Sequence, residues 1–179
     1  MKKFLLIIVL IALAIFFYLW HAGAPQEAEN IEIPTGTTFH PDASSAAFTI
    51  EGDKITLSKG ENETTDDNGF VSETKLLDER ALGDLNNDGK EDVVVLLSQS
   101  GGGSGTFIYV AAYVSGPVSY KGSEAIFLGD RIAPQAVSIT NGVATVKFLD
   151  RKENEPFAAE PTVSVSKQFI FKSGAFVEK

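Results

Sequence analysis

The sequence predicts an all-β domain, an antiparallel sandwich or barrel, preceded by one apolar N-terminal helix. Three observations support this prediction. Apolar and polar residues alternate along most of the chain after residue 45, as they do in half-buried strands. Two glycine-containing turns separate segments whose large apolar residues then fall on one face. After residue 21, no segment has an apolar stripe with convincing helical spacing.

The apolar helix is expected over residues 1–20. Two lysines precede residues 4–20, which carry no charge. This length lies between a secretory signal core and a full membrane span, and the aromatic residues at its outer end are typical of a membrane interface. We expect a signal-anchor that holds the chain in the cell membrane with its N-terminus cytoplasmic. The alternative is secretion after cleavage near Ala24, which Pro25 disfavours.

Residues 21–44 are expected to form a flexible tether, because they contain three prolines and no periodic pattern. The β-rich domain then covers residues 45–179, in the periplasm or outside the cell. Of the 15 basic residues two precede the apolar run, so from residue 21 onward 24 acidic residues face 13 basic ones. This charge repels nucleic acid and favours cations, so no nucleic-acid partner is expected.

Two hairpins are predicted, with two-residue turns at residues 52–53 and 141–142. In both hairpins, a one-residue shift of the strand pairing would place apolar residues opposite polar ones. The alternation of side chains therefore restricts the register. The expected cross-strand pairs are Ile50 with Ile55, Phe48 with Leu57, Ile139 with Ala144 and Val137 with Val146.

The remaining strands follow from the same pattern. The continuous apolar run at residues 93–97 predicts a central strand that is buried on both faces. Residues 72–82 are ambiguous between a strand and a segment with a helical turn. The glycine-rich segment 101–105 is expected to form a flexible hairpin loop. Further strands are predicted at residues 107–114, 125–128, 163–171 and 176–177.

An acidic segment, residues 83–92, carries oxygen side chains at every second position, with Gly89 at the point of a sharp turn. This spacing is typical of loops that bind one Ca²⁺. Weak binding is expected, because Val95 stands where a bidentate glutamate would complete an EF-hand. The alternative is a polar turn without metal. The expected ligands are the side chains of Asp84, Asn86, Asp88 and Asp92 and the backbone carbonyl of Lys90.

This acidic segment resembles the calcium loops of FG-GAP repeats. The longer stretch from Ala81 to Arg151 resembles a group of uncharacterised bacterial secreted proteins and lipoproteins. In those, a Gly-Asp-Leu-Asn-x-Asp-Gly segment precedes a Gly-Ser-Gly-Thr-Phe and a Leu-Gly-Asp-Arg segment, which are residues 103–107 and 128–131 here. The resemblance implies an envelope protein of unknown activity. The chain departs from that group because it lacks a lipidation cysteine.

The catalytic options are few. His21 and His40 are the only histidines, and both lie in the predicted tether, which leaves the domain without imidazole for a triad or a zinc site. The absence of Cys excludes a thiol nucleophile. A hydrolase that uses only carboxylates remains open. No Trp follows residue 20, but Tyr109, Tyr113 and Tyr120 could stack on a carbohydrate.

We therefore expect a non-catalytic extracytoplasmic domain that contacts the membrane through residues 4–20. It would be stabilised by one Ca²⁺ and would act in protein interaction or envelope maintenance, with an unknown envelope protein as its partner. Two alternatives remain, an envelope hydrolase of the carboxylate type and a purely structural β module without metal.

Overall fold

The computed structural model describes Phe17 and residues 40–179. Apart from Phe17, the predicted signal-anchor, residues 1–20, and most of the predicted tether therefore lie outside the described residues. In the part that is described, no helix has the length and apolar character needed to cross a membrane.

The described residues form an all-β domain of antiparallel strands, as predicted. Its largest sheet has the order β3-β4-β5-β6-β7, with β8 paired to β6 beside β7. The strands of this sheet are β3 (Glu61–Thr65), β4 (Val71–Gly83), β5 (Asp92–Gly101), β6 (Phe107–Val114), β7 (Lys121–Gly122) and β8 (Ile126–Asp130).

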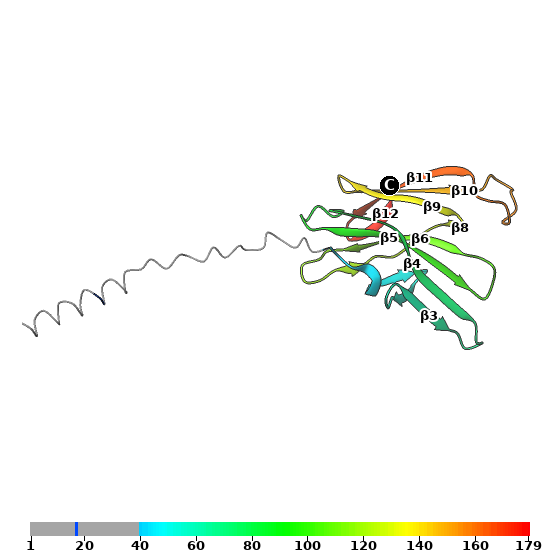
Figure 1. Cartoon of the computed structure of the whole chain (residues 1–179), viewed down its shortest axis with the longest axis horizontal. Coiled ribbons are helices and arrows are strands. Elements are labelled where there is room, and N and C mark those ends of the chain that lie inside the picture. Colours follow the sequence, from blue (N-terminus) through cyan, green and yellow to red (C-terminus); the bar gives the residue numbers. More distant parts are fainter. Residues whose placement is uncertain (1–16, 18–39) are drawn as a thin grey trace, which may run out of the picture. The chain divides into compact units, whose positions relative to one another are not determined.

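A four-stranded sheet with the order β12-β11-β10-β9 stacks on one face of the six-stranded sheet (Figure 1). A two-stranded hairpin and a short 3₁₀ helix, η1 (Ala43–Ser45), cover part of the other face. The strands are β9 (Ala133–Thr140), β10 (Val143–Asp150), β11 (Val163–Lys172) and β12 (Ala175–Glu178) in the four-stranded sheet, and β1 (Ala47–Ile50) and β2 (Asp53–Thr56) in the hairpin.

Two hydrophobic cores share β5 and β6. One side of these strands packs against the four-stranded sheet, where Val146, Phe148 and Phe169 are fully buried. The other side packs against Phe48 and other residues of the hairpin. Residues 93–97 are at most 1% exposed, which confirms the prediction of a strand buried on both faces.

Two isolated bridges lie next to the second core. A parallel bridge joins Thr49 of β1 to Glu124, and an antiparallel bridge joins Ser58 to Glu61 where β2 leads into β3. Hydrogen bonds of Thr49 to Ser123 and Ala125 thus hold β1 beside the segment that joins β7 to β8. The hydroxyl of Tyr109 donates to the Glu51 carboxylate at 2.9 Å. Burial of the tyrosine, followed by its interaction with Glu51, raises the pKa of Tyr109 to about 12.

The hairpin predicted at residues 141–142 is confirmed, with Ile139 opposite Ala144 and Val137 opposite Val146. Both turn residues have positive φ, as a type I′ turn requires.

The first hairpin forms, but the predicted turn at residues 52–53 is wrong by one residue. The turn is Glu51-Gly52, with φ of 52° and 94°, so Phe48 pairs with Ile55 rather than with Leu57. Ile50 pairs with Asp53 rather than with Ile55, because the glycine takes the second central position of a type I′ turn. The apolar residues still share one face, because moving the turn by one residue changes the cross-strand partner by two residues, and side chains alternate between the faces with a period of two.

The other predicted strands are present, and the ambiguous residues 72–82 lie in β4, whose pairing with β5 shifts between Leu76 and Arg80. The folded residues begin before residue 45. Pro41 and Ala43 are buried, and the Asp42 side chain caps η1 by accepting from the Ser44 N–H.

Gly122 lies where β7 crosses β1. A Cβ at this position would stand 2.0 Å from the Ala47 carbonyl oxygen and 2.9 Å from the Phe48 ring. We expect Gly122→Ala to lower the free energy of unfolding by about 1–3 kcal/mol, because backbone must move to admit the methyl group. Chemical denaturation measures this loss. Gly103→Ala is the matched control, since its Cβ would have only the Gly101 carbonyl at 3.9 Å nearby. Equal stability of the two variants would contradict this account of β7 and β1.

Candidate functional site

The acidic loop, residues 84–91, joins β4 to β5 and is held by its own side chains. The Asp84 carboxylate accepts the N–H groups of Asp88 at 3.1 Å and of Gly89 at 2.9 Å. The Asn86 side-chain oxygen also accepts from the Asp88 N–H, and Asp88 accepts from the Lys90 N–H at 2.9 Å. Short polar side chains bond to backbone two to five residues onward in this way in tight turns.

Asp92 closes the loop from inside the protein. Its side chain is fully buried, and it accepts three backbone N–H groups. One carboxylate oxygen accepts from Leu85 at 2.9 Å and from Asn86 at 3.3 Å, and the other accepts from Ser115 at 2.8 Å. Because a buried carboxylate without such donors would cost several kcal/mol, these bonds fix the start of β5 against the end of β6.

Ser115 also binds the exposed side of the loop. Its hydroxyl donates to Asp88 at 2.6 Å, and its carbonyl accepts from the Asn86 amide at 3.1 Å. The Lys90 amine reaches the Gly116 carbonyl at 3.2 Å. The Ser115 hydroxyl and then the Lys90 N–H lower the pKa of the Asp88 carboxyl. The loop and the segment after β6 are therefore bonded together along several residues.

Other segments contact the loop as well. The hydroxyl of Tyr120 donates to the Glu91 carbonyl at 2.7 Å. Burial, followed by the negative charges of Asp92, Asp88 and Glu91, raises the pKa of this tyrosine. On the opposite side, a Cβ at Gly142 in the β9–β10 turn would lie 3.2 Å from the Asn87 amide. The acidic loop thus touches both large sheets.

His40 corrects the expectation that the folded domain has no histidine. Its Nδ1 contacts the Glu91 carboxylate, although the two residues are 51 positions apart. Nothing in the sequence pattern indicated this contact, because His40 lies in a segment without periodicity.

The predicted calcium ligands lie in one loop, but their carboxylates do not form a cluster. Within residues 40–179, no three acidic or histidine side chains are placed so that they could hold a metal ion. The side-chain oxygens of Asp84, Asn86, Asp88 and Asp92 instead accept the N–H and O–H groups described above. A cation would have to share these oxygens with those donors. In this geometry the residues do not fit a preformed calcium site.

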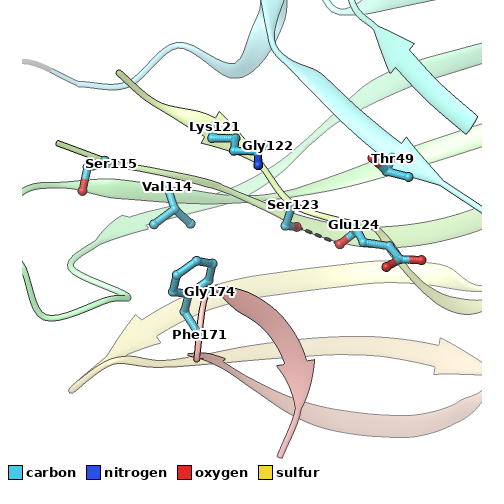
Figure 2. Close-up of a pocket in the computed structure, with 10 residues that line it drawn as sticks. Thr49, Val114, Ser115, Lys121, Gly122, Ser123, Glu124, Phe171 and Gly174 are labelled. Atoms are coloured by element: carbon cyan, nitrogen blue, oxygen red, sulfur yellow. Dashed lines mark hydrogen bonds between the residues drawn. The ribbon is translucent and has the colours of Figure 1, made fainter. Parts of the chain in front are cut away.

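A cleft with a volume of about 330 Å³ adjoins the loop (Figure 2). Val114 and Phe171 form its apolar wall, and Ser115 belongs both to it and to the loop contacts. The Ser123 hydroxyl accepts from the Ala112 N–H at 3.0 Å and donates to the Glu124 carbonyl at 2.7 Å, so it is engaged on both sides.

Lys121 and Glu124 are the ionisable side chains among the described lining residues of this cleft. Glu124 is the one carboxylate among its described lining residues, whereas glycoside hydrolysis by carboxylates needs two that flank the bond. Neither histidine nor cysteine is found in that lining.

Comparisons with protein families, with curated proteins and with solved structures gave no match. The function therefore rests on the geometry of the site. Sequence reasoning found the acidic loop but missed three residues that complete it, Ser115, Tyr120 and His40. An isolated serine or tyrosine in a polar turn carries no signal of such a role, since the partner lies more than twenty residues away.

Asp92→Asn tests the buried carboxylate. One side-chain oxygen becomes an NH₂ group that faces an N–H donor, so we expect a loss of about 3 kcal/mol in the free energy of unfolding. Denaturant titration followed by circular dichroism measures it. The control is Asp67→Asn, an exposed turn residue, which should change stability by less than about 0.5 kcal/mol. If both variants unfold at the same denaturant concentration, Asp92 does not hold the loop.

Proposed function

We propose that this chain is a membrane-tethered, non-catalytic binding domain that acts outside the cytoplasm, in protein interaction or envelope maintenance. The observation that supports this proposal most strongly is how the side chains of the acidic loop are hydrogen-bonded. Its polar side chains bond to backbone within the loop and to Ser115 after β6, which suits a rigid scaffold for surface recognition rather than a reactive centre.

The tether is proposed from the sequence. Residues 4–20 carry no charge and follow two lysines, an arrangement that places the N-terminus in the cytoplasm and the domain outside. The β domain has no cysteine and depends on its two hydrophobic cores for stability. The secreted form cleaved near Ala24 is the alternative.

Paired charges in the apolar segment test the tether. We expect Leu10→Arg combined with Leu13→Arg to move the full chain from the membrane fraction to the soluble fraction, because each arginine at a helix centre costs about 2.5–3.5 kcal/mol in membrane insertion. Leu10→Val combined with Leu13→Val is the matched control and should stay in the membrane fraction.

Membrane fractionation and the intact mass of the recovered protein give the readout. A wild-type chain found soluble and shortened to a start near Ala24 would contradict the anchor. A wild-type chain found uncleaved but soluble would contradict any membrane contact through residues 4–20.

Weak calcium binding to the acidic loop is a second proposal, favoured by the alternating oxygen side chains of Asp84, Asn86 and Asp88. With a Kd of about 10⁻⁴–10⁻³ M, Ca²⁺ at about 10 mM should add about 1.4–2.7 kcal/mol of stability and raise the unfolding midpoint by several degrees. Thermal melts of the full chain in Ca²⁺ and in chelator measure this shift. Asp84→Asn should reduce it. Identical midpoints in Ca²⁺ and chelator would leave a loop that functions without metal.

A further inference from the structure

A second cleft shares Thr49, Lys121 and Gly122 with the first and brings together two tyrosines and two lysines from distant parts of the chain. Its volume is about 370 Å³, within the size range of small-ligand sites. Tyr113 comes from the end of β6, Lys54 from β2, and Tyr120 and Lys121 from the segment that enters β7. We call it the tyrosine cleft.

The two tyrosine rings form an aromatic wall. Their centroids are 5.3 Å apart with an angle of 33° between the ring planes. Both residues are partly exposed. Tyr113 is fixed from behind by an edge contact with Phe48, at 6.4 Å between centroids, and Tyr120 by its hydrogen bond to the Glu91 carbonyl. The wall is therefore rigid before any ligand arrives, which lowers the entropy cost of binding.

The lysines give the cleft its charge. Lys54 and Lys121 are exposed, and neither forms an ion pair within residues 40–179. They lie beside Tyr120, which also feels the negative charges of the acidic loop, so the two ammonium groups are the positive side of the cleft. Ammonium groups at the rim of a cleft attract an anion and fix where its charge lies.

We propose that the tyrosine cleft binds an acidic oligosaccharide. The C–H face of a sugar ring packs on the negative face of an aromatic ring, which suits the wall formed by Tyr113 and Tyr120. A carboxylate on the same sugar is then held by Lys54 and Lys121. A neutral sugar satisfies only the first requirement and a simple inorganic anion only the second.

This inference deepens the proposed binding function and rests on it, because it assumes that the ligand is held and not cleaved. Its test is calorimetric titration of the full chain in detergent with hexagalacturonate, at low and high salt. Maltohexaose serves as the neutral probe of equal length, and linear polyphosphate as the anion without sugar rings. We expect hexagalacturonate to bind at least about fivefold more tightly than either probe, a difference of about 1 kcal/mol.

Four variants separate the contributions. Lys54→Gln combined with Lys121→Gln should weaken hexagalacturonate binding by at least about fivefold and reduce its salt dependence. Lys59→Gln combined with Lys147→Gln, two exposed lysines elsewhere, removes the same charge and should leave the affinity unchanged. Tyr120→Ala should weaken binding more than Tyr120→Phe, which keeps the ring and loses only the hydrogen bond to the Glu91 carbonyl. Circular dichroism melts establish that each variant is folded.

The proposal fails if hexagalacturonate does not bind, if maltohexaose binds equally well, or if the control lysine pair weakens binding as much as Lys54 and Lys121 do. If polyphosphate bound as tightly as hexagalacturonate and Tyr120→Ala had no effect, the cleft would attract anions in general. That result would also overturn the proposal. Chromatography of the sugar after incubation keeps the two proposals apart. Cleaved products would refute the non-catalytic function, whereas absence of binding would refute only the acidic-sugar ligand.

Discussion

The buried carboxylate of Asp92 is the contact on which the rest of this structure depends. It stands at the first position of β5, the strand that both hydrophobic cores share, and it accepts N–H groups from Leu85, Asn86 and Ser115. A carboxylate enters a protein interior only where donors replace the water that it loses. The start of β5, the acidic loop and the end of β6 must therefore assemble together.

The acidic loop extends this arrangement to the rest of the domain. Leu85 lies in the core between the two large sheets, and Asn87 lies against the turn at Gly142 in the four-stranded sheet. Tyr120 and His40 contact Glu91 on the other side. Both clefts border this region, since Ser115 lines the first and Tyr120 lines the second. A rigid loop thus determines where the polar groups of the two clefts stand.

The same feature explains why the chemistry of the loop was hard to predict. Oxygen side chains at alternate positions suit a cation, and they suit a turn in which each side chain accepts a nearby N–H. The sequence of the loop is compatible with both. What favours the internal hydrogen bonds is Ser115, which binds Asp88 and Asp92 and lies 27 and 23 residues beyond them.

The sequence by itself determined the all-β class, the strand buried on both faces at residues 93–97 and the turn at Asn141-Gly142. These features depend on period-two patterns and on the φ preferences of adjacent residues, which are local properties. Tertiary structure decided the register around Glu51-Gly52, the contact of His40 with Glu91, and the meeting of Tyr113 and Tyr120 with Lys54. Local sequence patterns could not decide any of these features. The alternation of apolar and polar residues is equally compatible with two positions of the first turn, and side chains far apart in the chain meet only once the strands have packed together.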